Sequence, residues 1–135
     1  MALAFLIGRL IFGGFFLFNG VNLVLMHAQS AQYAAAKGVP IPDVAVMVAA
    51  LLLLFGSVSI LLGWRPELGV TAIVLFLIAV SFPMHNFWAI RDPNQHLLEL
   101  GNFMKNMALL GAALMLVAVP QPWPYSVETR RRIIG

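Results

Sequence analysis

The hydrophobic positions of this chain are gathered in four long runs, separated by short polar or proline-containing breaks. The runs extend over about residues 3–26, 44–64, 68–90 and 100–119. A helix that crosses about 30 Å of hydrocarbon needs about 20 mainly apolar residues, and each run is long enough to do so. The pattern therefore predicts an all-α protein, an integral membrane bundle of four transmembrane helices in a single domain, residues 1–135.

The breaks between the runs predict how the helices are joined. Residues 65–67 (RPE) predict a tight turn between the second and third helices, and residues 91–94 (RDPN) predict a break before the fourth. Residues 28–42 form the longest connector, in which AQSAQYAAAK predicts a short helix that ends at Gly38. We expect this short helix to lie along the membrane interface.

Composition agrees with a membrane protein and excludes several kinds of chemistry. The chain is 61% hydrophobic and 10% charged, so a water-soluble domain would have too little polar surface. It has no cysteine, which excludes disulfides, iron–sulfur clusters and thiol–disulfide exchange. The net charge of +3 comes largely from Arg130–Arg132, which suits a membrane surface better than a nucleic acid.

The distribution of cations between the loops predicts the orientation. With four spans, Arg65 and Arg130–Arg132 share one side of the membrane, and Lys37 and Arg91 share the other. The positive-inside rule then places both termini in the cytoplasm. A cleaved signal peptide is the alternative reading of the first run, but Arg9 interrupts that run and no basic cluster precedes it.

Polar residues inside the predicted spans are concentrated in their outer halves. On the first and fourth helices they form stripes within arcs of about 140° and 120°, so inward-facing stripes would make a polar pocket open to the outer face. Such a pocket could bind a neutral or anionic head group. The alternative for the asparagines is interhelical hydrogen bonding without a ligand, and Lys105 could instead extend toward the membrane surface. The candidate ligand-binding residues are Asn19, Asn22, His85, Asn86, Trp88, Asn102, Lys105 and Asn106.

Three further residues are candidates for anchoring at the membrane surface. Trp64 and Trp123 fall at predicted helix ends, where aromatic belts occur, and Arg9 could pair with a lipid phosphate or hold the turn at Glu67. The histidines are too widely spaced in sequence to predict a metal site. Haem ligation by His27 and His85 stays open as an alternative.

Several segments together resemble the DoxX family of small four-helix bacterial membrane proteins. The resemblance implies a bundle in the bacterial inner membrane, in a family whose members are linked to quinol oxidase and thiosulfate:quinone oxidoreductase complexes and to oxidative-stress assemblies. Relatives often carry a lysine near the position of Asn22, a glutamate near that of Leu53 and a glycine-rich C-terminus, none of which is present here. The segments are GRLIFGGFFLFNGVNLV, YAAAKGVPIP, GSVSILLGWRPELG, HNFWAIRDP and FMKNMALLGAALML.

These observations predict a redox-associated membrane subunit. Lys105, His85 and Asn106 would donate hydrogen bonds to a quinone head group, while a redox partner protein would supply or accept electrons. We expect an accessory subunit rather than a self-sufficient oxidoreductase, in contact with the bilayer, without nucleic acid, and able to form homo-oligomers. A non-catalytic adaptor or assembly factor that docks a partner complex is the alternative, and a small transporter is a further one.

Overall fold

The computed structural model describes residues 1–129 and consists of helices and connecting turns. Four of the helices are long and apolar enough to cross a membrane, which confirms the predicted all-α bundle. Arg130–Arg132, which contributed to the predicted orientation, lie outside the described residues. The elements are α1 (Ala2–Leu25), α2 (His27–Ala36), α3 (Pro42–Leu62), α4 (Pro66–Met84), the 3-10 turn η1 (Phe87–Ala89) and α5 (Pro93–Val117).

Two helix boundaries differ from the sequence prediction, one because of a capping residue and one beside a proline. The last helix begins at Pro93 rather than near Leu100, since the Asp92 carboxylate accepts a hydrogen bond from the backbone N–H of Gln95 at 2.9 Å. Polar residues that hydropathy assigned to a break are therefore helical. The predicted third helix, α4, ends at Met84 rather than near Ile90, one residue after Pro83, and the chain continues through η1.

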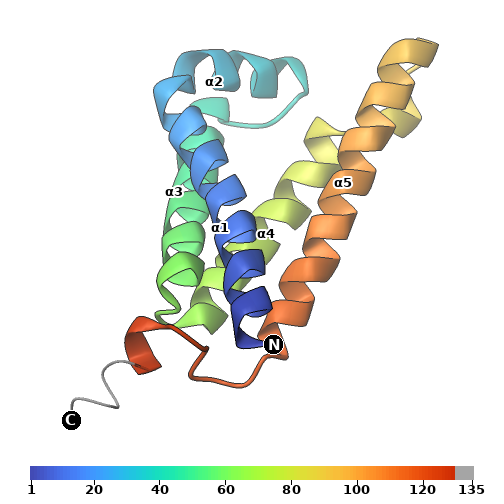
Figure 1. Ribbon diagram of the computed structural model, residues 1–135. Coiled ribbons are helices and arrows are strands. Elements are labelled where there is room, and N and C mark those ends of the chain that lie inside the picture. Colours follow the sequence, from blue (N-terminus) through green and yellow to red (C-terminus); the bar gives the residue numbers. More distant parts are fainter. Residues whose placement is uncertain (130–135) are drawn as a thin grey trace.

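The short helix α2 lies across one end of α1 and α3, as Figure 1 shows. Its start is held by His27 Nε2, which lies 3.3 Å from an Asp43 carboxylate oxygen. Ala31 and Ala34 pack against Val46 of α3. We call this end of the bundle the α2 end, and the opposite end, where the N-terminus and the segment after α5 lie, the terminal end.

Helices α3 and α4 approach closely because glycine lies between them. A Cβ atom on Gly56 would meet Ile73 Cδ1 at 2.8 Å and the Gly69 carbonyl oxygen at 2.9 Å. Small residues allow this approach in membrane bundles, where packing rather than water exclusion drives association. The largest cluster of buried apolar side chains lies beside this contact, and its buried members are Phe16, Leu53, Ile60, Val70, Ile73, Leu77, Ala113 and Trp123.

The segment after α5 folds back beneath the terminal end, which corrects two of the expected anchors. Trp123 is 1% exposed and packs edge-to-face on Phe5, and Arg9 is 2% exposed. The Arg9 guanidinium donates to the carbonyl oxygens of Pro124 at 3.1 Å and Tyr125 at 3.0 Å. Neither side chain reaches the lipid, because the returning segment covers both.

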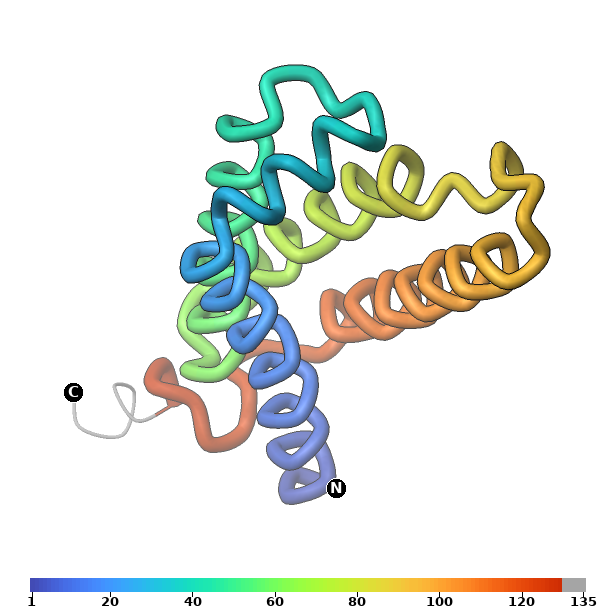
Figure 2. The backbone as a smooth tube through the Cα atoms, turned by 90° about the horizontal axis from the view of Figure 1, so that it is seen from above, coloured from blue at the N-terminus to red at the C-terminus, as the bar shows by residue number. Residues whose placement is uncertain are grey.

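The last helix packs mainly on α4 and η1, and only sparsely on α1, α2 and α3. Figure 2 shows α4 and α5 running together away from α1 and α3 toward η1. At the α2 end, α5 therefore stands apart from α1, whereas the two helices converge at the terminal end (Figure 1). This divergence positions the polar residues of α1, α4 and α5 around the space between them.

Candidate functional site

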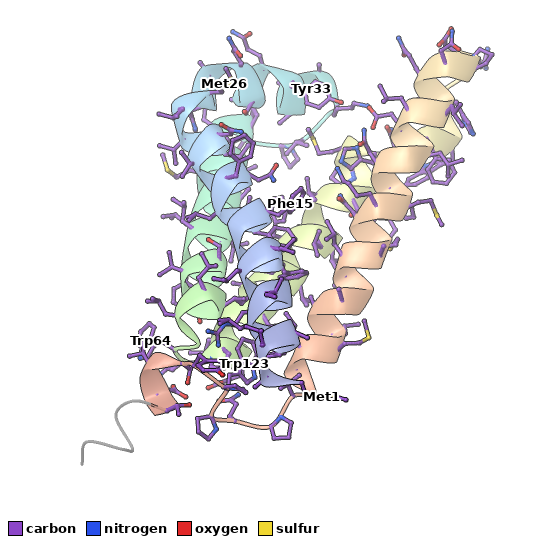
Figure 3. The ribbon with its side chains drawn as sticks, in the orientation of Figure 1. Met1, Phe15, Met26, Tyr33, Trp64 and Trp123 are labelled. Atoms are coloured by element: carbon purple, nitrogen blue, oxygen red, sulfur yellow. The ribbon has the colours of Figure 1, made fainter. Side chains whose placement is uncertain are left out.

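A polar cavity of about 110 Å³ lies between α1, α4 and α5. Four of the predicted candidates contribute to its wall: two lie on α5, one lies on α1 and one directly follows α4. Apolar side chains, three of them phenylalanines, complete the wall. The cavity is lined by Phe15, Phe16, Asn19, Phe76, Leu77, Val80, His85, Lys105 and Asn106. Figure 3 shows Phe15 on the side of α1 that faces this space.

The two asparagines of the polar cavity already use their amide nitrogens within the protein. Asn19 Nδ2 donates to the Phe15 carbonyl oxygen at 2.8 Å. Asn106 Nδ2 donates to Ser81 Oγ at 3.2 Å, and the serine hydroxyl donates in turn to the Leu77 carbonyl oxygen. These bonds leave the two amide oxygens to accept hydrogen bonds from a ligand.

Lys105 lies halfway along α5, equally far in sequence from Pro93 and Val117. Its side chain is exposed at the polar cavity and makes no hydrogen bond or ion pair with the residues that the structure describes. An ammonium at the centre of a span costs about 2.5–3.5 kcal/mol on insertion scales. Lys105 is therefore the costliest group of the cavity, and an acceptor bound there would offset that cost.

At the α2 end, the Glu99 carboxylate binds three side chains from separate parts of the chain. Oε2 lies 2.7 Å from His85 Nδ1, while Oε1 accepts from Tyr33 Oη at 3.1 Å and from Lys37 Nζ at 3.2 Å. Glu99 is 8% exposed. We call these four residues the Glu99 network, and it ties α2, the end of α4 and α5 together.

The surroundings of Tyr33 shift the pKa of its phenol. Burial and the neighbouring Glu99 carboxylate raise the pKa of Tyr33, because both disfavour the phenolate. Figure 3 shows Tyr33 at the end of α2 that points toward α5. The Tyr33 side chain is partly exposed, and its hydroxyl helps to hold the Glu99 carboxylate.

Glu99, Tyr33 and Lys37 were not among the predicted site residues, although one signal was present in the sequence. A carboxylate within a membrane span is expensive unless it is paired, so Glu99 required a partner. Glu99 and Asn106 are seven residues apart and thus about 20° apart around the helix, which places both on one face. The partners themselves could not be found from sequence, because they lie on other helices.

The remaining candidates lie outside the wall of the polar cavity. Asn22 and Asn102 are partly buried but do not line it, and Asn86 is the residue that precedes η1. Trp88 is 56% exposed and packs edge-to-face with Phe87 and Phe103. Trp64 stays exposed at the terminal end, where its role as a lipid anchor remains a prediction.

A second space, larger and almost entirely apolar, lies beneath α2 between α3 and α4. Its volume is about 430 Å³, and Ser30 and Tyr33 are the polar side chains on its wall. Phe76 and Val80 of α4 line both this apolar groove and the polar cavity. The two spaces are thus neighbours on either side of α4.

Two of the three histidines contact carboxylates, and each contacts a different one. His27 pairs with Asp43, and His85 pairs with Glu99. Within residues 1–129, no group of three or more His, Cys, Asp and Glu side chains is arranged to hold a metal ion.

The fold and the cavity describe a small four-span membrane protein with polar side chains enclosed between its helices. The family model of DoxX matches residues 4–86, which include all but the first two residues of α1 and the whole of α2, α3 and α4. The chain belongs to the DoxX family, as the sequence resemblance predicted. Comparison with curated proteins found no match, and comparison with solved structures found none either.

Proposed function

We propose that this protein is a redox-associated membrane subunit that binds a quinone head group in the polar cavity. The observation that carries the proposal is the composition of the cavity wall, in which Lys105, His85 and two asparagines meet three phenylalanine rings. A quinone head group is flat and apolar on its faces and has two oxygens at opposite edges. It needs aromatic or aliphatic walls together with a few polar groups, as ligand sites in proteins generally provide.

The donors and acceptors of the cavity suit both redox states of such a head group. The Lys105 ammonium can donate to a carbonyl oxygen, and the amide oxygens of Asn19 and Asn106 can accept from a hydroxyl. A quinone would supply the two-electron chemistry. A partner protein would exchange electrons with it, so the subunit would be an accessory one.

The proposal also states in which membrane the protein lies and which end of the bundle faces the cytoplasm. The protein would lie in the bacterial inner membrane with the terminal end in the cytoplasm, as the loop cations and the family suggest. The polar cavity would then be nearer to the outer surface. The exposed apolar side chains of α1 and α5 would face lipid or a second copy of the chain.

Mass spectrometry and absorbance of the gently purified native complex test this proposal. We expect quinone in stoichiometric amount, and we expect it to be lost when Lys105→Ala removes the ammonium. Met104→Ala is the matched control, because Met104 is the next residue on α5 and is exposed away from the cavity wall. Purified wild-type protein that neither retains nor binds a quinone would contradict the proposal, and stoichiometric haem would replace it with the haem alternative.

One observation favours the adaptor as a second candidate. The Glu99 network is satisfied entirely by residues of this chain, so these polar groups can serve to lock the helices without any ligand. An adaptor predicts that a Lys105→Ala protein keeps its partner proteins and its cellular phenotype. Loss of the phenotype in a stably folded Lys105→Ala protein would exclude it.

A further inference from the structure

The polar cavity has room for a head group but not for a whole lipid-like molecule. Its volume of about 110 Å³ lies well below the roughly 300 Å³ at which sites for drug-sized ligands begin. The apolar groove beneath α2, with a volume of about 430 Å³, lies within the range of such sites. A ligand whose head group lies in the cavity must therefore extend beyond it, and the groove is a neighbouring space of sufficient size.

Two helices border both spaces with residues that lie one turn apart. On α4, Phe76 and Val80 line the polar cavity and also the apolar groove. On α1, Asn19 lines the cavity, and Leu23, four residues later on nearly the same face, lines the groove. The first helix packs mainly on α3 and little on α4. A flexible chain can therefore leave the cavity and enter the groove between α1 and α4.

We propose that the apolar groove binds the isoprenoid tail of the quinone whose head group occupies the polar cavity, and that the tail passes over Phe76 and Val80 between the two. The inference rests on the proposed function. It adds a second subsite and a ligand class, a long-tailed membrane quinone rather than a short, water-soluble one. Such a tail carries methyl branches and no polar atom, so it needs a branched apolar surface without free hydrogen-bonding groups.

The wall of the apolar groove meets this need. Alanine and valine predominate in it, and the small side chains of Ala45, Ala49 and Ala79 leave width for the methyl branches. Of its two polar side chains, Tyr33 already uses its hydroxyl to bind the Glu99 carboxylate. Val48 and Ala79 are exposed, so the groove opens toward the hydrocarbon, and a tail longer than the groove continues into the bilayer.

The Glu99 network connects the walls of the two spaces. His85 lines the polar cavity and Tyr33 lines the apolar groove, and the Glu99 carboxylate binds both, at 2.7 and 3.1 Å. The network thus holds the head-group subsite and the tail subsite in a fixed relation. Because lipid tails are as apolar as the groove, the tail gains by packing rather than by leaving water, and its contribution to affinity is moderate.

The test measures quinone binding to the full chain in nanodiscs of phosphatidylcholine. The probes are a short-tailed and a long-tailed isoprenyl benzoquinone with the same head group, with affinities expressed per mole fraction in the bilayer. Ala49→Phe and Ala79→Phe fill the groove from its α3 and α4 walls. Met47→Phe is the matched control, because Met47 is 51% exposed on α3 and lies outside the groove wall. Circular dichroism establishes that each variant is folded.

The tail subsite predicts that the wild type binds the long-tailed quinone roughly tenfold more tightly than the short-tailed one. This preference disappears in Ala49→Phe and Ala79→Phe, whereas their affinity for the short-tailed quinone is unchanged, and Met47→Phe keeps the preference. A diazirine on the tail of the long-tailed quinone labels the wild type within residues 45–52 and 76–84. Unlabelled quinone suppresses that labelling, and added phosphatidylcholine does not.

Three outcomes overturn the tail subsite while head-group binding persists. The first is equal affinity of the wild type for the two quinones, and the second is an unchanged preference in both groove-filling variants. The third is labelling of the groove that phosphatidylcholine suppresses and quinone does not, which would show that bilayer lipid occupies it. The labelling uses wild-type protein, so it decides the matter even where a variant fails to fold. If the short-tailed quinone does not bind the wild type either, the proposed function itself fails.

Discussion

Glu99 Oε2 lies 2.7 Å from Nδ1 of His85, and this contact fastens α5 to the residue that ends α4. The same carboxylate also holds Lys37, whose side chain is largely buried. Because α5 packs mainly on α4 and η1, the Glu99 carboxylate links it by hydrogen bonds to Tyr33 of α2 and to Lys37 directly after α2. Removal of the Glu99 carboxylate should therefore affect the stability of the whole bundle.

Replacement of Glu99 by alanine should destabilise the fold by about 2–4 kcal/mol, because it leaves Lys37 and His85 without their acceptor in a poorly hydrated place. Glu99→Gln should cost less, since the amide oxygen still accepts hydrogen bonds. Denaturant titration of the purified proteins, followed by circular dichroism, measures the difference. Equal stability of wild type and Glu99→Ala would show that the network contributes nothing to folding.

The two lysines beside the site should respond in opposite directions to replacement by methionine. Lys105→Met removes a charge that is unpaired among the described residues, and it should raise the stability of the ligand-free protein by up to about 3 kcal/mol. Lys37→Met breaks the ion pair with Glu99 and should lower it by about 1.5–3 kcal/mol. Unfolding midpoints of the two variants, compared with wild type, decide this. A loss of stability in Lys105→Met would mean that its ammonium has a structural partner.

Gly56 and Gly14 form a matched pair that tests the helix packing. Alanine at Gly56 would bring Cβ within 2.9 Å of the Gly69 carbonyl oxygen, which belongs to the backbone, so the helices must separate at a cost of about 1–3 kcal/mol. A Cβ at Gly14 meets nothing within 4 Å, so Gly14→Ala should stabilise α1 by about 0.5–1 kcal/mol. Thermal unfolding in detergent distinguishes the two, and equal shifts would contradict the close contact.

Arg9 should control how firmly the C-terminal segment is attached. Arg9→Met removes both hydrogen bonds to the carbonyl oxygens of Pro124 and Tyr125, and cleavage by chymotrypsin next to Tyr125 should become about tenfold faster. Arg9→Lys should not restore protection, because an ammonium lacks the planar fork that reaches two oxygens at once. Arg91→Met, at the exposed turn before α5, is the control and should leave the cleavage rate unchanged.

The raised pKa of Tyr33 gives the protein a specific sensitivity to alkali. Because the folded state keeps the phenol protonated above its ordinary pKa of 10.0, this contribution to stability is fully present below that value. It is lost as the pH rises through the higher pKa of the folded state. The difference in melting temperature between wild type and Tyr33→Phe should therefore change between about pH 9 and pH 12.

The hydrophobic runs determined most of the architecture, because crossing a bilayer requires long apolar helices whatever their neighbours are. Local chemistry also placed α2 and the turn before α4 correctly. Hydropathy could not locate the start of α5 at Pro93, since a capped first turn of polar residues is as helical as an apolar one. The polar stripe predicted for the last helix includes Lys105 and Asn106, while Asn19 lies in the second half of α1 and His85 directly follows α4.

Tertiary structure alone decided which of these polar groups meet. Sequence periodicity reports the face of a helix but not the neighbour opposite that face, so the partners of Glu99 on α2 and α4 could not be derived from it. For the same reason the sequence could not predict that Arg9 and Trp123 are buried, and it placed both at the lipid surface. Both are buried because the chain after α5 returns beneath α1, and the direction of that return depends on packing between residues more than a hundred positions apart.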